Sequence, residues 1–322
     1  MNRSWIKALL ALSMVLALNL ASAQVWPARP VKLIVPVGAG SFGDILARMM
    51  AEEMQLVFKQ PFVVENRPGA TGMIAADFVA KQPADGYTLL VMTNSAHSAN
   101  PHLFKKMSYE PVKGFTAIAR VCYVPFVLMV AHDSPIRSIE DLLARGKATP
   151  GKLTYGHSNS TSQVAGAAFN TLSGINATGV AYKASPQALT ELVSGRLDFI
   201  FNDAGSSAAF IKAGRLRPIA VTSASRSALF PDLPTVAEGA QMTGFSVAAW
   251  AGVGGPAGMP DDIVQKISDV VIDLTRRATF QDKLAAMGAE PAPARSDEFV
   301  TYLHQQLDLW GQKVRQAGIE KE

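Results

Sequence analysis

The chain has 322 residues, of which 48% are hydrophobic and 17% charged, enough for two domains with their own hydrophobic cores. The formal net charge is only +4 and lysine and arginine form no dense run, so no nucleic-acid partner is expected. The single cysteine, Cys122, excludes an internal disulfide framework, and its apolar neighbours predict a buried thiol that is not a nucleophile.

The first 23 residues have the three parts of a secretory signal peptide. Arg3 and Lys7 supply the positive charge, residues 8–20 are almost wholly apolar, and residues 21–23 are small, as cleavage requires. The apolar run is shorter than the ~20 residues that cross a bilayer. We therefore expect export to the periplasm, with cleavage before Gln24 and no insertion of the mature chain into the membrane.

Short apolar runs then alternate with amphipathic ones. The predicted strands are residues 31–37, 62–65, 87–93, 126–131, 153–156, 180–182, 198–201, 219–222 and 250–253. The predicted helices are residues 44–58, 73–81, 138–145, a helix beginning at Gln163, 186–194, 260–277 and 296–315. Ser138, with Asp141 at the fourth position, marks a helix start. The alternation predicts an α/β fold with mostly parallel sheets flanked by helices.

This pattern runs through twice, which predicts two lobes with the chain crossing from one to the other and later returning. The crossovers are expected near residues 121–124 and near Trp250. The expected division is a signal peptide over 1–23, lobe 1 over 24–122 and 251–322, and lobe 2 over 123–250.

A glycine-rich turn follows the first predicted strand. Gly38, Gly40 and Gly43 match the pattern G-x-G-x-x-G, and Glu65 follows the second strand where a ribose-binding acid would lie. A Rossmann-type NAD-dependent oxidoreductase is thus one alternative, although export would separate it from the cytoplasmic cofactor pool. More generally, glycines let the backbone approach a ligand, and a helix start binds anions. The candidate ligand-binding residues here are Gly38, Ala39, Gly40, Ser41, Phe42 and Asp44.

Three further polar clusters lie at the carboxyl ends of predicted strands, where open α/β sheets bind ligands. In one of them, Ser160 or Thr161 could simply cap the following helix. Four clusters, two from each half of the chain, are more than capping alone explains. The additional candidates are Thr93, Asn94, Ser158, Asn159, Ser160, Thr161, Ser162, Asn202 and Asp203.

The sequence contains no convincing arrangement of catalytic residues. The five histidines show no H-E-x-x-H spacing, and the G-x-S-x-G motif is absent. His157 and Ser158 are adjacent only in sequence, and Asp44 at a helix start suits the helix dipole better than a role as general base. We therefore expect no enzyme activity, no catalytic residue, no metal and no cofactor.

Several blocks spread over the mature chain form a distinctive set. They are W-P-A-R-P-V-K-L-I-V-P at 26–36, E-N-R-P-G-A at 65–70, D-G-Y-T-L-L at 85–90, Tyr182-Lys183, P-D-L-P-T-V at 231–236, G-A-E-P at 288–291 and the helix around Trp310. Together they resemble the solute-binding proteins of tripartite tricarboxylate transporters, also called Bug proteins.

The resemblance implies a type II periplasmic solute-binding fold whose two lobes close like a clam shell on a small organic carboxylate. It implies that residues 38–44 hold the carboxylate, partly through water, and that residues 158–163 bind the far end of the ligand. Tyr182 is a further candidate ligand-binding residue. The implied partners are the carboxylate and the membrane permease subunits of such a transporter, with the protein itself a monomer. A periplasmic carboxylate sensor is the other alternative.

The chain departs from the family pattern mainly in the candidate ligand loops. Gly38 stands where proline is common, Ser41 where glycine is common, and Gly43 where threonine is common. Ala184 replaces a common glycine, and Asn202-Asp203 reverses the usual order of the two residues. These departures leave the fold expectation intact and leave the ligand open.

Overall fold

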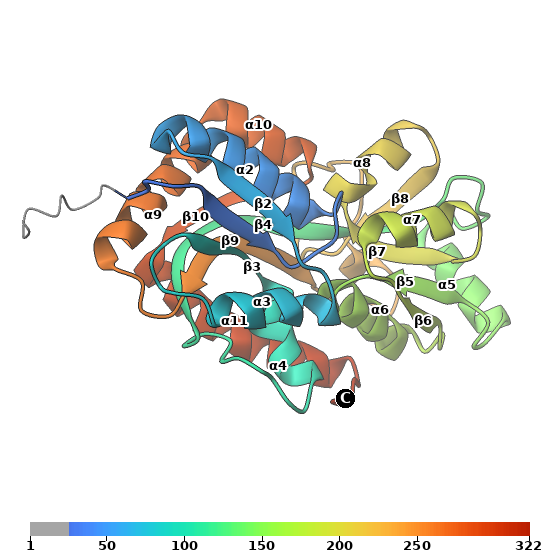
Figure 1. Cartoon of the computed structure of the whole chain (residues 1–322). Helices are drawn as coiled ribbons and strands as arrows, with labels where there is room; N and C mark the ends of the chain where they lie inside the picture. The colour runs from blue at the N-terminus through green and yellow to red at the C-terminus, as the bar shows by residue number, and fades with distance from the viewer. Residues whose placement is uncertain (1–25) are drawn as a thin grey trace, which may run out of the picture.

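One long strand, β4 (Phe115–Ala131), belongs to two sheets and runs through both lobes of the molecule (Figure 1). As far as Pro125 it pairs with β9 (Ala248–Pro256), and from the next residue onward it pairs with β7 (Phe199–Asp203) and β8 (Leu216–Val221). The computed structural model describes residues 26–322, so the predicted signal peptide lies outside the described residues. Within that range no helix has both the length and the apolar character needed to span a membrane.

Lobe 1 contains five strands in the order β2-β1-β3-β9-β4, with β10 (Glu290–Arg295) on the other side of β4. β1 (Val31–Val35) pairs in parallel with β2 (Phe62–Asn66) and with β3 (Thr88–Thr93). β9 pairs antiparallel with both β3 and β4.

Lobe 2 repeats this order as β6-β5-β7-β4-β8. β5 (Thr154–His157) pairs in parallel with β6 (Thr178–Ala181) and β7, and β4 pairs antiparallel with β7 and β8. Each lobe therefore has three parallel strands followed by a strand that arrives from the other lobe.

The expectation of mostly parallel sheets holds for the three outer strands of each lobe and not for the strands where the lobes join. β4 carries the chain out of lobe 1 and β9 carries it back, so the two strands run in opposite directions side by side. A sheet that contains both crossing strands must be mixed.

Helices cover both faces of each sheet, as predicted. Figure 1 shows α2, α9 and α10 on one face of the lobe 1 sheet and α3, α4 and α11 on the other. The helices are α2 (Phe42–Phe58), α3 (Met73–Ala80), α4 (Asn100–Leu103), α5 (Ile139–Ala148), α6 (Ser160–Ser173), α7 (Ser185–Val193), α8 (Ala204–Lys212), α9 (Asp261–Arg276), α10 (Ala278–Ala286) and α11 (Ser296–Gln316), with short turns of helix η1 (Ala70–Gly72), η2 (Ser95–Ala99) and η3 (Val236–Glu238). The predicted start of α5 is confirmed, because the Ser138 side chain accepts the Asp141 N–H at 3.2 Å.

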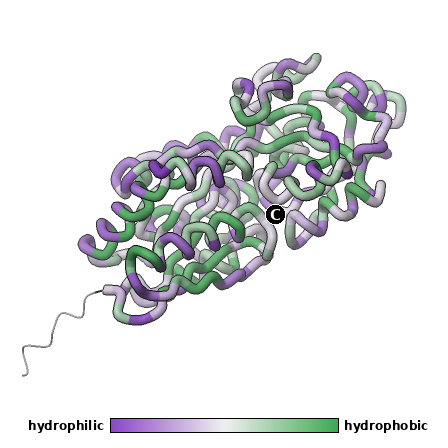
Figure 2. The backbone as a smooth tube through the Cα atoms, turned by 90° about the horizontal axis from the view of Figure 1, so that it is seen from above, coloured by the Kyte–Doolittle hydropathy of each residue, from purple (hydrophilic) through white to green (hydrophobic). Residues whose placement is uncertain are grey.

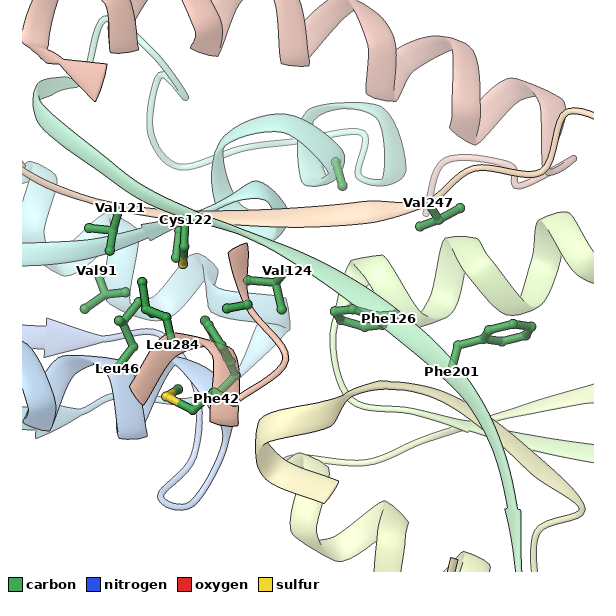
Figure 3. Close-up of a cluster of buried hydrophobic side chains, with 14 of the residues drawn as sticks. Phe42, Leu46, Val91, Val121, Cys122, Val124, Phe126, Phe201, Val247 and Leu284 are labelled. Carbon is green, nitrogen blue, oxygen red and sulfur yellow. The ribbon is translucent and has the colours of Figure 1, made fainter. Parts of the chain in front are cut away.

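The hydrophobic core follows the strands through the elongated molecule, and Figure 2 shows hydrophobic stretches of chain in both lobes. Around β4, side chains from α2 and α10 gather on the lobe 1 side, and Phe126 lies near Phe201 on the lobe 2 side (Figure 3). Cys122 is fully buried on β4, and burial raises the pKa of its thiol to about 12. It is the structural thiol that the sequence predicted.

A second core cluster surrounds His97, on the turn η2 after β3. The imidazole is fully buried, packs edge-on against Phe115 at 4.7 Å, and its Nδ1 donates to the Pro111 carbonyl at 2.8 Å. Nε2 has no partner, and burial lowers the His97 pKa from 6.5 to about 4 despite the hydrogen bond to Pro111. The folded protein therefore holds this histidine neutral.

We predict that His97 makes the protein less stable as the pH falls from 6.5 towards 4, because the unfolded chain takes up a proton that the folded chain cannot. Urea denaturation near pH 7 and about pH 5 should show wild type losing about 2 kcal/mol more than His97→Asn, which keeps a donor for Pro111. The lowered pKa values of His102 and His157 affect both proteins alike. Equal pH slopes would contradict the prediction.

Candidate functional site

A cavity of about 70 Å³ lies where the lobes meet, and the N-terminal ends of four helices surround it. The N-cap residues Ser41 of α2, Asn159 of α6, Ala184 of α7 and Asp203 of α8 all line it. The first N–H groups of a helix lack intrahelical acceptors and carry the positive end of its dipole. This cavity is therefore suited to an anion, and both lobes contribute to it.

The rest of the wall is largely apolar and comes from the crossing strands. Val124 and Phe126 of β4 and Trp250 of β9 form part of it, beside Val37, Ala249 and Ala251. A ligand with a small apolar body and polar ends matches such a lining.

The start of α2 meets the cavity through Ser41, Phe42 and Gly43. Ser41 makes no side-chain capping bond, and the N–H groups of Phe42 and Gly43 belong to the first helical turn, which has no intrahelical acceptors. Phe42 also packs in the main core and is only 8% exposed, so it is both a wall of the cavity and a packed aromatic.

Asp44 supports this loop and does not line the cavity. Its carboxylate accepts the Gly40 N–H at 2.9 Å and Asn66 Nδ2 at 2.9 Å, and it pairs with Arg48 at 2.9 Å. Burial alone would raise the pKa of Asp44, but these hydrogen bonds and the Arg48 charge hold it below its usual value. Asp44 is thus placed to fix the loop and not to contact a ligand or act as a base.

Gly38 and Gly40 lie close to lobe 2 and do not line the cavity, whereas Ser41 does. A Cβ atom on Gly38 would lie 2.8 Å from Cβ of Ala184, and Gly40, at φ +74°, lies against Pro186. Ala39 is exposed. Gly38, Ala39 and Gly40 therefore lie beside the cavity, where the loop must be slim for the lobes to meet.

Glu65, the acid that a dinucleotide site would require, is engaged elsewhere. It pairs with Arg67 at 2.6 Å and Lys32 at 3.5 Å and does not line the cavity. The glycine motif is therefore present without its ribose-binding partner.

The start of α6 is capped by Asn159, and not by Ser160 or Thr161. The Asn159 side chain accepts the Ser162 N–H at 3.0 Å, and Ser162 Oγ accepts the Asn159 N–H at 3.3 Å. Ser162 is occupied by this capping box and does not line the cavity, whereas Ser158, Asn159 and Thr161 do.

Two hydroxyl groups of α6 bind directly across to lobe 1. Thr161 Oγ1 donates to Asn94 Oδ1 at 3.1 Å, and Ser160 Oγ donates to Asn100 Oδ1 at 2.5 Å. Ser160 is fully buried and outside the cavity wall, so its hydroxyl joins the lobes and does not face the cavity.

The pair at the end of β7 divides between two faces of the strand. Asn202 lies behind the cavity, where its Nδ2 donates to Ser206 Oγ at 2.9 Å and Ser207 Oγ at 3.0 Å. Asp203 lines the cavity, and its Oδ1 caps α8 by accepting the Ser206 N–H at 2.7 Å. Asn202 is thus another expected residue that does not line the cavity.

Within residues 26–322, three buried side-chain donors on lining residues have no acceptor: Ser41 Oγ, Asn94 Nδ2 and Trp250 Nε1. Their residues are at most 4% exposed. Because buried polar groups in proteins are nearly always hydrogen-bonded, unpaired donors from three different elements around one cavity favour an acceptor-rich ligand there.

A second cavity adjoins the first and shares Thr93, Ser95, Ser158 and Lys183 with it. Tyr182, a candidate from the sequence, lines this second cavity, as do His157 and the turn η1. Burial lowers the pKa of His157 and raises that of Tyr182, so both side chains are neutral at pH 7. Lys183, which is exposed, lines both cavities.

Sequence reasoning did not single out Lys183, Ala184 or Ser185 as cavity residues, nor the apolar wall from β4 and β9. Lys183, Ala184 and Ser185 had a usable signal, because they directly precede the predicted helix at residues 186–194 and a helix start can bind an anion. The wall residues had none, because ordinary core residues look the same. Within residues 26–322 no group of three histidine, cysteine or acidic side chains is placed to hold a metal ion.

Comparisons with known proteins agree with this geometry. A family model described as "Tripartite tricarboxylate transporter family receptor" matches residues 46–319. A UPF0065 protein of Bordetella bronchiseptica is 34% identical over 322 residues, which cover 98% of this chain and 94% of that protein.

Two solved structures share the fold over nearly the whole chain. A structure from R. palustris with adipate has a TM-score of 0.89 and 35% identity, covering 92% of this chain and 100% of that one. MatC from Rhodopseudomonas palustris with bound malate has a TM-score of 0.83 and 28% identity, covering 90% of this chain and 100% of that one.

The fold is therefore that of a two-lobed periplasmic solute-binding receptor, as the sequence predicted. The chain belongs to the receptor family of the tripartite tricarboxylate transporters, which confirms the resemblance.

Removing two different hydroxyl groups of the cavity should change the stability of the protein by different amounts. Thr161→Val should lower the free energy of unfolding by about 1–3 kcal/mol, because it leaves the buried Asn94 amide without its only partner among the described residues. Ser41→Ala removes a hydroxyl that has no partner and should change stability by less than about 0.5 kcal/mol. Chemical denaturation measures both, and equal losses would contradict these hydrogen-bond assignments.

Proposed function

We propose that this protein is exported to the periplasm, captures a small organic carboxylate between its lobes, and delivers it to the membrane permease subunits of a tripartite tricarboxylate transporter. It catalyses no reaction in this role and acts as a monomer. The observation that carries the proposal is the interlobe cavity, where four helix N-termini meet and three lining residues carry unpaired buried donors. The adipate and malate in two related structures support a carboxylate ligand.

We propose that lobe 1 comprises residues 24–122 and 251–322, and lobe 2 residues 123–250. The change of sheet on β4 after Pro125 lies close to the first of these boundaries. The proposed ligand contacts are the predicted residues that line the cavity or its neighbour: Ser41, Phe42, Thr93, Asn94, Ser158, Asn159, Thr161, Tyr182 and Asp203.

The free energies involved are sufficient without a buried cation. A carboxylate at a helix N-terminus gains roughly 0.3–2 kcal/mol, and each hydrogen bond to a charged oxygen contributes about 1.5–3 kcal/mol. Two or three such bonds and the helix ends together approach the ~8 kcal/mol of micromolar binding. Since each lobe holds only part of the ligand, binding favours the closed state.

Thermal-shift and calorimetric titration with mono-, di- and tricarboxylates should reveal at least one acid that stabilises the mature protein. For that acid, Ser41→Ala should weaken binding about 10- to 100-fold, because a hydroxyl group that donates to the carboxylate is lost. Ser98→Ala is the matched control: its hydroxyl is also buried and unpaired, but it does not line the cavity. If neutral sugars or cations bind and no carboxylate does, the proposed function is wrong.

Closure of the lobes can be tested at the contact between Gly38 and Ala184. Gly38→Ala places a methyl group within 2.8 Å of the Ala184 side chain, so the lobes cannot meet as they do here. We expect at least a ~10-fold loss of affinity for the carboxylate. The double variant Gly38→Ala/Ala184→Gly should recover most of it. A double variant as weak as the single one would show that the loss has another cause.

A further inference from the structure

Asp203 is the one acidic residue among the residues that line the cavity. β7 alternates its side chains, so Phe199 and Phe201 pack in the main core, Asn202 lies on the opposite face, and Asp203 ends the strand at the cavity wall. The residue is only 3% exposed. A carboxyl group therefore forms part of the lining of a site proposed to bind a carboxylate.

Only one oxygen of this carboxyl group is used by the protein. Oδ1 accepts both the Ser206 N–H and Ser206 Oγ, each at 2.7 Å. Oδ2 accepts no hydrogen bond from the described part of the chain, and Asp203 takes part in none of the ion pairs found there. Burial raises the pKa of Asp203, whereas the Ser206 N–H and hydroxyl at the start of α8 favour the ionised carboxylate from one side. The other side of the group is left to the cavity contents.

A ligand bearing only carboxylates would set a negative charge against this oxygen. Like charges in a sheltered site repel strongly, whereas a hydroxyl or ammonium group would donate to Oδ2, which accepts no hydrogen bond from the described residues. The unpaired donors of Ser41 and Asn94 can meanwhile serve the ligand's carboxylate. The cavity thus provides for both kinds of group in one small molecule.

We propose that the ligand of this receptor carries a hydrogen-bond donor in addition to its carboxylate, so that it is a hydroxy acid or an amino acid, and that Asp203 Oδ2 accepts from that donor. This inference rests on the proposed function and narrows its ligand class. Asp203 is then the residue that selects against the plain carboxylic acid of the same skeleton.

Isothermal titration of the mature protein with matched acids tests the selection. One series is propionate, lactate and alanine, and the other is succinate, malate and aspartate, so each series adds a hydroxyl or an amino group to one skeleton. In at least one series we expect a donor-bearing acid to bind at least ~10-fold more tightly than its parent, the usual range for an unpaired buried polar group. Which of the two acids binds tells hydroxyl from ammonium.

Asp203→Asn should reduce that preference to about twofold or less. Its amide oxygen can still cap α8, so the helix start is preserved while the charge is removed. Asp198→Asn is the control, since Asp198 lies just before the other end of β7 and accepts from Thr154 away from the cavity. It should leave the preference unchanged.

Two results would overturn the inference while leaving carboxylate capture intact: wild type binding both parent acids as tightly as their derivatives, or Asp203→Asn retaining the full preference. The first comparison uses wild type alone, so it stands even if the variant folds poorly. If no acid of either series binds and no other carboxylate does, the proposed function itself fails, and the inference with it.

Discussion

Backbone N–H groups at the start of a helix need an acceptor, and in this protein four helices begin around one cavity. Three of these helices belong to lobe 2 and one to lobe 1. A ligand held by one lobe alone therefore cannot reach the N–H groups of all four. A ligand that meets all four helix starts therefore has to contact both lobes. Ser, Asn and Thr side chains and an apolar wall complete the lining, and the loop at Gly38 lies beside it.

The strands that join the lobes also build the cavity wall. β4 and β9 pass between the sheets side by side and place Val124, Phe126 and Trp250 against the ligand space. The same two segments of chain thus join the lobes and line the cavity.

Much of the fold could be predicted from the sequence, since local pattern decides it. The cap at Ser138 and the apolar periodicity of α2, α9 and α11 located helices within a few residues. β10 was missed because two prolines interrupt its pattern, and they are tolerated where the strand pairs only with β4. α8 was missed because its small and hydroxyl-bearing residues give a weak helical signal.

The site could be predicted only as a set of strand ends. Which side chains face the cavity depends on strand alternation and on cross-lobe partners, and a single sequence shows neither. Asp44, Ser160 and Asn202 have suitable chemistry, yet each is occupied by a neighbour in the fold. Conversely, Asp203 both caps α8 through Oδ1 and lines the cavity, and its Oδ2 is not used in the cap.

The near contact between Gly38 and Ala184 gives a new meaning to two departures from the family pattern. In the family pattern, proline is common at position 38 and glycine at position 184. This chain has the side chain at position 184, in lobe 2, and none at position 38, in lobe 1. The methyl group of Ala184 then partly offsets the loss of a proline ring at position 38. Positions 38 and 184 should therefore covary among relatives, with a larger residue at one position matched by glycine at the other. The two substitutions are far apart in the sequence, yet they compensate each other where the lobes meet.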